Sequence, residues 1–346
     1  MSATETVPVI GVGASAGGVE AMRQLFAHLP GDLPAAVLVV LHVPPESSSQ
    51  LAAVLAAVCR LPVSVAADGE PPRAGHVYVA TPDRHLLVQD GRVHLSRGPR
   101  ECRMRPAVDV LFRSLAAEFG RHAAGVVLSG TLDDGTAGLW AIKEHGGHAF
   151  VQDPAEALHP GMPQNAMAHM EVDGVAGASA LAGRLQAWAT GALQAAHEVQ
   201  APRPGVRIEL AIAAGAHALQ CGVMDLGQPS PFTCPECHGV LVQLEEGRVV
   251  RFRCHTGHAY SMRSLLAEVD VAIDNSLWSS CRAIEERQLL LRELSAAARQ
   301  RGAAADAEAY ALRAQDLERV VKALRQLLHD PALFAEAESG TRPRDA

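Results

Sequence analysis

The sequence lacks the features that mark several large classes of protein. Basic residues are outnumbered, with 30 Lys and Arg against 38 Asp and Glu, and the net charge is -8 at pH 7. Binding to a nucleic-acid backbone needs clustered cations, so we expect no nucleic-acid partner. The chain has no apolar run long enough to span a bilayer and no export signal at its start. We therefore expect a cytoplasmic protein that does not insert into a membrane.

A disulfide framework is also missing. The seven cysteines are odd in number and unevenly placed, which favours reduced thiols or metal ligands. What is present is the composition of a folded globular protein, with 48% hydrophobic and 20% charged residues. The length of 346 residues exceeds the usual domain size of roughly 100–200 residues. We therefore expect one catalytic domain with an appendage.

Short apolar runs alternate with segments of helical periodicity in the first half of the chain. The runs at 7–13, 35–43 and 123–130 have the continuous hydrophobicity of buried parallel strands. Between residues 62 and 96 the pattern changes to shorter strands, and Asp90-Gly91 is typical of a hairpin turn. The predicted fold class is α/β, a doubly wound, mostly parallel sheet with an antiparallel edge.

Stretches rich in proline and glycine divide the rest of the chain. Beyond residue 262 the periodicity is helical with an interruption near Gly302, which predicts a hairpin of two helices. The predicted organisation is a catalytic domain at 1–195, a linker at 196–230, a zinc-ribbon-like module at 231–262, a helical region at 263–332 and a disordered tail at 333–346.

A glycine-rich turn follows the first predicted strand and has two interpretations. A dinucleotide site requires G-x-G-x-x-G and an acid about 20 residues further on. The glycines stand instead at 11, 13, 17 and 18, and the second strand ends in His42. The alternative is a nucleophile elbow from Gly13 to Gly17, in which small neighbours project the Ser15 hydroxyl. Glycines in such a turn can also serve close packing alone.

A serine nucleophile needs a base and an acid that orients the base. His42 stands at the carboxyl end of the second strand, where α/β sheets form their ligand crevices. Asp133 and Asp134 follow the run at 123–130, and one of them is expected to cap the next helix. Ser, His and Asp thus fall where one crevice can collect them. For His42 the competing interpretation is a histidine that caps a neighbouring loop.

A second constellation lies in the C-terminal half. Cys234 and Cys237 are two residues apart, as in a metal knuckle, and Cys254 follows after 16 intervening residues. Together with His258 they form a plausible Cys₃His site for a structural zinc ion, and His255 is the alternative fourth ligand. A structural metal would stabilise a module too small for its own core. The competing interpretation is a small β-hairpin with reduced thiols and no metal.

Several longer motifs carry a family resemblance: IGVGASAGGVEAM, YVATPDRHLL, LSGTLDDGTAGL and GMPQNAM. On these motifs, residues 7–193 resemble the catalytic domain of the chemotaxis protein-glutamate methylesterases, the CheB type. The resemblance implies that Ser15 is the nucleophile, His42 the base and Asp134 the orienting acid, with Asp133 its neighbour. It also implies that the backbone N–H groups of Ala16 and Thr131 stabilise the oxyanion.

The resemblance further implies an activity and partners. Members of this family hydrolyse glutamate γ-methyl esters on receptor helices, and many deamidate glutamines. We therefore expect a methylated chemoreceptor or similar signalling protein as substrate, a cognate methyltransferase as a further partner, and no catalytic cofactor. The alternatives are a small-molecule serine esterase or amidase and a catalytically idle signalling scaffold. Retention of all three triad residues argues against the scaffold.

Two departures from the family pattern affect these expectations. Thr131 and Leu132 replace the Met-Gly that usually follows Gly130, and Met104 stands where His is common. Both changes concern the wall of the predicted cleft and therefore the substrate preference. The first strand begins within ten residues of Met1, so we do not expect the N-terminal receiver domain of the best-known members. Control is then expected from a partner or from the C-terminal half.

Overall fold

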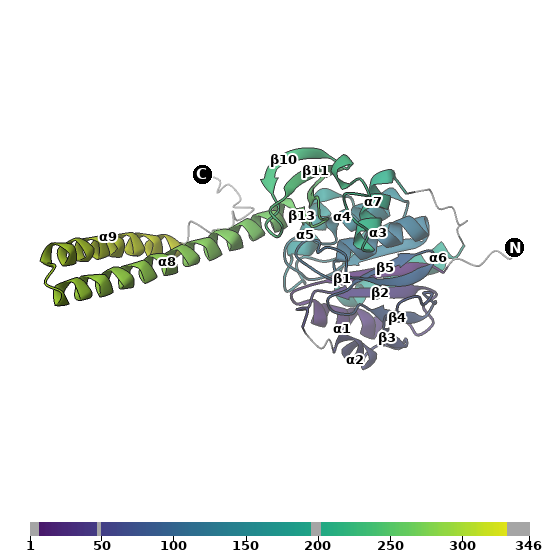
Figure 1. Cartoon of the computed structure of the whole chain (residues 1–346). Helices are drawn as coiled ribbons and strands as arrows, with labels where there is room; N and C mark the ends of the chain where they lie inside the picture. The colour runs from purple at the N-terminus through teal and green to yellow at the C-terminus, as the bar shows by residue number, and fades with distance from the viewer. Residues whose placement is uncertain (1–6, 47–49, 195–201, 331–346) are drawn as a thin grey trace, which may run out of the picture. The chain divides into compact units, whose positions relative to one another are not determined.

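A parallel sheet of seven strands forms the centre of the first part of the chain. The computed structural model describes residues 7–46, 50–194 and 202–330 (Figure 1). The order of the strands is β3-β4-β2-β1-β7-β8-β9, and every pairing in this sheet is parallel. Their bounds are β1 Val9–Ala14, β2 Ala36–Leu41, β3 Val63–Val65, β4 His76–Val79, β7 Ala123–Val127, β8 His148–Gln152 and β9 Gly174–Ala176.

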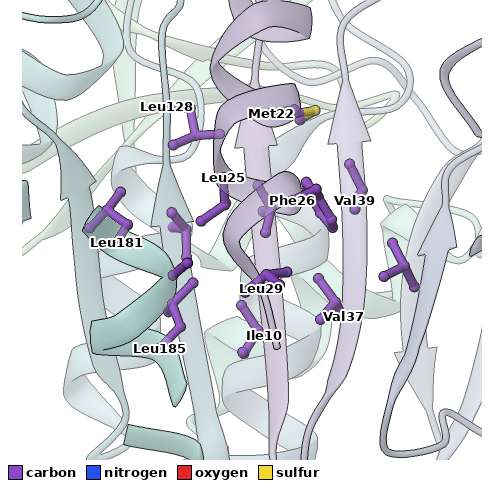
Figure 2. Packing of buried hydrophobic residues seen from close by; sticks show 14 of the residues in the cluster. Ile10, Met22, Leu25, Phe26, Leu29, Val37, Val39, Leu128, Leu181 and Leu185 are labelled. Atoms are coloured by element: carbon purple, nitrogen blue, oxygen red, sulfur yellow. The ribbon is translucent and has the colours of Figure 1, made fainter. Parts of the chain in front are cut away.

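Helices cover both faces of this sheet, as the alternating apolar pattern predicts. One face packs against α1 (Gly18–His28), α2 (Leu51–Ala56) and α6 (Ala178–Ala192). Figure 2 shows Met22, Leu25 and Phe26 of α1 beside the strand residues Ile10, Val37 and Val39. The other face packs against α3 (Val108–Phe119), α4 (Thr136–Glu144) and α5 (Gly161–His169). The predicted doubly wound α/β fold is confirmed.

The antiparallel excursion differs from the sequence prediction. Strands β5 (His85–Gln89) and β6 (Arg92–Ser96) pair antiparallel in a separate two-stranded sheet, joined by Asp90 and Gly91 at φ 51° and 67°. Strands β3 and β4, predicted with them, are parallel members of the main sheet. The partly exposed edge strand β3 lacks the continuous hydrophobicity of a buried parallel strand, so its sequence resembles an antiparallel one.

Helix α3 is buried on nearly all sides. Of its 12 residues, only Glu118 is not buried. Val108, Leu111, Phe112 and Leu115 pack toward the main sheet. The opposite side of α3 lies against other elements, since Val110 packs with Leu87 of β5 and Ala213 of α7. A short 3₁₀ turn, Gly120–His122, connects α3 to β7.

The cysteine-rich segment is a four-stranded antiparallel sheet of β10 (Gln228–Thr233), β11 (Val240–Glu246), β12 (Val249–Cys254) and β13 (Ala259–Ser261). We call residues 228–261 the cysteine module. Its small core contains Leu241, Phe252 and Tyr260. Residues 1–265 form one compact unit, so the module is not a separate body.

The predicted linker at 196–230 also differs from the structure. Its residues 204–213 form α7 (Pro204–Ala213), and a 3₁₀ turn follows at Val223–Asp225. Val206, Glu209 and Ile212 of α7 are buried. Pro204 occupies the first turn of this helix, a position that favours proline. The proline that suggested a linker therefore marks the start of a packed helix.

The second compact unit, residues 266–346, contains a helical hairpin. Helix α8 spans Met262–Gln300 and α9 spans Ala304–Leu328, with Gly302 in the left-handed region at φ 77°. Contacts from Arg325 to Glu285 and from Ser295 to Ala307 show that the helices run antiparallel, as predicted. In the described part of the chain no helix is both long and apolar enough to cross a membrane. The tail predicted at 333–346 lies outside the described residues.

Candidate active site

Ser15 lies in the sharp turn between β1 and α1. Gly17 caps α1 in a left-handed conformation with φ 72°, and a Cβ atom there would lie 2.7 Å from Ser129 Oγ. The turn therefore requires glycine at this position. The Ser15 N–H donates to the Ser129 carbonyl at 3.0 Å, and the Gly18 N–H donates to the Ser15 carbonyl at 2.9 Å. These bonds fix the partly buried Ser15 at the carboxyl end of the sheet.

His42 follows β2 and lies beside the Ser15 turn. Its N–H donates to the carbonyl of Ala14 at 3.1 Å, which continues the pairing of β1 with β2 by one step. Its Nε2 lies 2.7 Å from Asp134 Oδ2, and the two side chains are 6% and 3% exposed. In the tautomer that donates from Nε2, the Nδ1 atom is the proton acceptor. The structure thus brings His42 and Asp134 into contact, as their strand-end positions predicted.

Asp134 accepts four hydrogen bonds and is fully enclosed. Besides His42, the backbone N–H groups of Val108, Asp109 and Gly135 donate to its two oxygens at 2.7, 3.0 and 2.9 Å. Burial acts to raise the pKa of Asp134. The hydrogen bond from His42 and the N–H groups of α3 outweigh burial and hold that pKa below its ordinary value. The group is therefore an anion at neutral pH and can stabilise an imidazolium.

The loop after β7 brings Asp134 toward the Ser15 turn. A Cβ atom on Gly130 would lie 2.0 Å from Met162 Sδ and 3.0 Å from Ser15 Cβ, so glycine allows these segments to pack closely. Ala16 and Thr131, the predicted oxyanion donors, lie on the two segments that meet here. Among the residues that the structure describes, no hydrogen bond joins the Ser15 hydroxyl to His42. The structure thus pairs the side chains of His42 and Asp134. Ser15 is placed near them by its backbone, since Ala14 bonds to the His42 N–H and Ser15 bonds to Ser129.

Comparison with known proteins agrees with this geometry. The family model described as CheB methylesterase matches residues 10–185, just over half of the chain. The chain belongs to the CheB methylesterase family. The crystal structure of the Thermotoga maritima CheB methylesterase catalytic domain is similar, with a TM-score of 0.51 and 31% identity over 53% of this chain and 98% of that one.

Two curated relatives extend the comparison. Protein-glutamate methylesterase/protein-glutamine glutaminase 1 of Geobacter metallireducens is 40% identical over 54% of this chain and 52% of its own length. The protein of the same name from Burkholderia pseudomallei is 43% identical over 53% of this chain and 51% of its own. The chain thus spans about half the length of the curated relatives it matches.

The CheB methylesterase domain also contains a buried acid that the sequence interpretation missed. Asp109 is 3% exposed, and its Oδ1 accepts the Gly138 N–H at 2.7 Å. One of its carboxylate oxygens lies within 4.8 Å of one of Asp134 and of the Cys102 sulfur. Burial, followed by the charge of Asp134, raises the pKa of Asp109 to about 8. The signal in the sequence was an acid inside the otherwise apolar run at the start of α3.

Asp133 and Asp134 point to different partners. The Oδ1 atom of Asp133 accepts the hydroxyl of Ser261 at 2.6 Å, so Asp133 contacts the cysteine module. This separates it from the pair formed by His42 and Asp134. The contact with Ser261 had no signal in the sequence, because 128 residues separate the two positions.

Within the cysteine module, the predicted metal ligands lie together. The ligand atoms of Cys234, Cys237, Cys254 and His258 are all within 4.8 Å of one another. The Cys237 and Cys254 sulfurs are 3.6 Å apart, and His258 Nδ1 lies 3.6 Å from the sulfurs of Cys234 and Cys254. Sulfurs about 2.3 Å from a tetrahedral ion lie roughly 3.8 Å apart, so the group fits zinc.

The surroundings of this group distinguish the two histidines. His258 Nε2 lies 3.3 Å from Glu236 Oε2, and the other oxygen, Oε1, accepts the Tyr260 hydroxyl at 3.0 Å. A carboxylate on the far nitrogen is the usual partner of a metal-bound histidine. The ring of His255 instead lies against Gly239, where a Cβ atom would be 2.0 Å from its Nδ1. The geometry therefore favours His258 as the fourth ligand.

Proposed function

We propose that this chain hydrolyses glutamate γ-methyl esters on chemoreceptor-like signalling proteins. The observation that carries the proposal is the buried pair of His42 and Asp134, 2.7 Å apart, beside the Ser15 turn. Two relatives that this chain matches over about half of their length are named protein-glutamate methylesterase/protein-glutamine glutaminase 1. Deamidation of glutamine is therefore part of the proposal, and a receptor and its methyltransferase are the expected partners.

In the proposed reaction Ser15 is the nucleophile and His42 the base. His42 Nδ1 takes the hydroxyl proton as Ser15 Oγ attacks the ester carbonyl, and the N–H groups of Ala16 and Thr131 stabilise the oxyanion. His42 then gives the proton to the departing methanol, which leaves a glutamyl ester on Ser15. Water hydrolyses that ester with His42 again acting as base. Asp134 holds the imidazolium throughout.

The test compares Ser15→Ala with Ser179→Ala, which alters an exposed serine of α6. Methanol release from a methylated receptor fragment should fall by roughly 10³-fold to 10⁶-fold in Ser15→Ala and stay unchanged in the control. A fluorophosphonate should label Ser15 alone. Native methanol release by Ser15→Ala would refute the proposal. Turnover of simple esters without turnover of the receptor fragment would favour a small-molecule esterase, and an unlabelled Ser15 would favour an idle scaffold.

We also propose that Cys234, Cys237, Cys254 and His258 bind one structural zinc ion. The support is the tetrahedral fit of the four ligand atoms and the carboxylate of Glu236 behind His258. Three thiolates and an imidazole complete the coordination of zinc and leave no position for a substrate. The ion would supply stability to the cysteine module and no step of the hydrolysis.

A further inference from the structure

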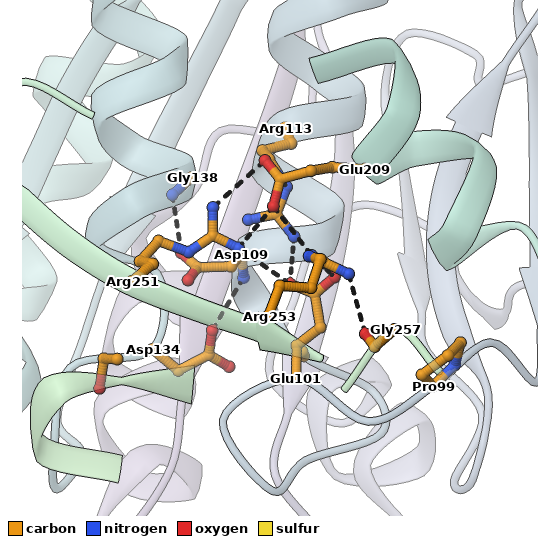
Figure 3. Close-up of polar contacts among 12 residues, drawn as sticks. Pro99, Glu101, Asp109, Arg113, Asp134, Gly138, Glu209, Arg251, Arg253 and Gly257 are labelled. Carbon is orange, nitrogen blue, oxygen red and sulfur yellow. Dashed lines mark hydrogen bonds and ion pairs between the residues drawn. The ribbon is translucent and has the colours of Figure 1, made fainter. Parts of the chain in front are cut away.

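Five charged side chains meet where the cysteine module touches the catalytic domain (Figure 3). We call them the arginine–glutamate cluster; each is 3% exposed or less. Its members are Glu101, Arg113 of α3, Glu209 of α7, and Arg251 and Arg253 of β12. The cluster therefore joins the Glu101 segment and α3 to α7 and β12, which lie about 100 residues or more further along the chain.

The contacts within the cluster are short. Arg253 Nη2 lies 2.6 Å from Glu101 Oε1 and 2.9 Å from Glu209 Oε1, and Arg251 Nη2 lies 2.8 Å from Glu209 Oε1. Arg113 donates to the other oxygen of Glu101. Burial acts to raise the pKa of Glu101, but the three arginines lower it to about 2. Both carboxylates are thus anions held between cations, and removal of one partner would leave buried charge uncompensated.

This cluster bears on the catalytic acid through α3. The N–H groups of Val108 and Asp109 at the start of α3 hold the Asp134 carboxylate. Arg113 follows Asp109 by four residues, so both lie on the same side of the helix. A shift of α3 would therefore move the donors that fix Asp134 and, through it, the ring of His42.

A second set of contacts reaches the other side of the Asp134 loop. The Ser261 hydroxyl donates to Asp133 Oδ1 at 2.6 Å, next in sequence to Asp134. Two backbone hydrogen bonds join Ala259 to the segment that carries Glu101. The Ala259 N–H donates to the Arg100 carbonyl at 3.2 Å, and the Cys102 N–H donates to the Ala259 carbonyl at 2.8 Å. The module thus contacts the Asp133–Asp134 loop directly and reaches Arg113 of α3 through Glu101.

We propose that Ser261 and Arg253 of the cysteine module are positioning residues for Asp134. They keep α3 and the Asp133–Asp134 loop in the arrangement that orients His42. This inference rests on the proposed function. It makes the module a point of control, because an event that loosens the module lowers turnover without changing the Ser15 turn.

The first experiment compares Ser261→Ala with Ser264→Ala in the full chain. Ser264 exchanges hydrogen bonds with Ser261 at the first turn of α8, and within the described residues its hydroxyl has no hydrogen bond to Asp133. Ser261→Ala should lower kcat on the methylated receptor fragment by about tenfold to 100-fold with KM unchanged, as misplaced catalytic groups do. Ser264→Ala should retain the kcat of the unaltered chain.

The second readout is the proton between His42 and Asp134, followed by its downfield NMR resonance. This signal should broaden or shift in Ser261→Ala and in Arg253→Lys. The lysine keeps the cation but loses the planar guanidinium, which donates to Glu101 and Glu209 from Nη2 and to the Gly257 carbonyl from Nη1. Zinc content and circular dichroism verify that each variant is folded. An unaltered resonance together with an unaltered kcat in both variants would overturn the inference.

The two proposals fail in different ways. If the unaltered chain neither releases methanol nor reacts with fluorophosphonate, the proposed function is wrong, but the His42–Asp134 resonance still tests positioning. If the unaltered chain is active and Ser261→Ala and Arg253→Lys match it in kcat and resonance, only the positioning role is wrong. Should Arg253→Lys not fold, Ser261→Ala decides the outcome, because it leaves every charge of the arginine–glutamate cluster in place.

Discussion

Two neighbouring carboxyl groups in the CheB methylesterase domain differ in charge: Asp134 is an anion and Asp109 is neutral. Asp134 accepts hydrogen bonds from His42 and from the start of α3, and its pKa lies below the ordinary value. Asp109 has one backbone donor, and its pKa rises to about 8. Ionisation of both carboxyl groups at this distance is unfavourable because the two negative charges repel. The group with more hydrogen-bond donors is therefore the one that ionises. Asp109 is therefore a neutral acid next to the ionised Asp134.

The substitution Asp109→Asn tests this assignment. The unfolded chain loses the Asp109 proton near pH 4, whereas the folded protein keeps it up to about pH 8. The contribution of this group to stability is therefore full below about pH 4 and is lost as pH rises toward about 8. Arg113, Arg251 and Asp134 are the charges that act on it.

Asp109→Asn should remove the loss of stability that ionisation of Asp109 causes as pH rises. It should also keep an oxygen that accepts the Gly138 N–H. Its free energy of unfolding, relative to the unaltered chain, should be higher at pH 8 than at pH 4, and the proposed esterase activity should be retained near neutral pH. Urea denaturation at the two pH values measures the difference. The exposed Asp32→Asn is the control and should show no such trend. An equal pH dependence in Asp109→Asn and the unaltered chain would contradict the neutral assignment.

At the scale of elements, the sequence predicted those whose signal is local. Continuous hydrophobicity located β1, β2 and β7, and the rule that crevices form at the carboxyl ends of parallel strands brought His42 and Asp134 together. The parallel pairing of β3 and the packing of α7 depend on neighbours distant in sequence. Glu101 and Arg253, for example, are 152 residues apart, and nothing in the local pattern of either marks a partner.

Substitution in the arginine–glutamate cluster should affect stability strongly. Glu101→Gln leaves Arg113 and Arg253 with less compensating charge, which should cost about 3–5 kcal/mol at neutral pH. The folded pKa of Glu101, about 2, lies below its unfolded value, so its stabilisation is present above about pH 4 and is lost as pH falls toward 2.

The difference between Glu101→Gln and the unaltered chain should therefore shrink in acid. Chemical denaturation at pH 7 and pH 3 measures it, and the exposed Glu20→Gln of α1 serves as the matched control. A loss below about 1 kcal/mol at neutral pH, typical of a surface ion pair, would show that the cluster does not stabilise the contact between the module and α3.

For the whole molecule, the zinc site was predicted from spacing alone, and the four ligand atoms do lie together. Purified protein should contain one equivalent of zinc. His258→Ala should reduce this content, whereas His255→Ala should retain it because His255 lies against Gly239. Removal of zinc with a chelator should raise hydrogen exchange in the cysteine module. Zinc near zero in the unaltered chain, or equal loss in both histidine variants, would contradict the assignment.

The arginine–glutamate cluster also limits which parts of this chain can be exchanged with those of its relatives. A catalytic domain cut off near residue 195 would keep the pair of Glu101 and Arg113 but would lose Glu209, Arg251 and Arg253, which bury and neutralise that pair in the full chain. Transplantation of the module onto another methylesterase would likewise strand Arg251 and Arg253 unless both acids travel with them. The part of the chain that can be exchanged is therefore the whole compact unit that ends at residue 265. The five residues of the arginine–glutamate cluster must be gained or lost together.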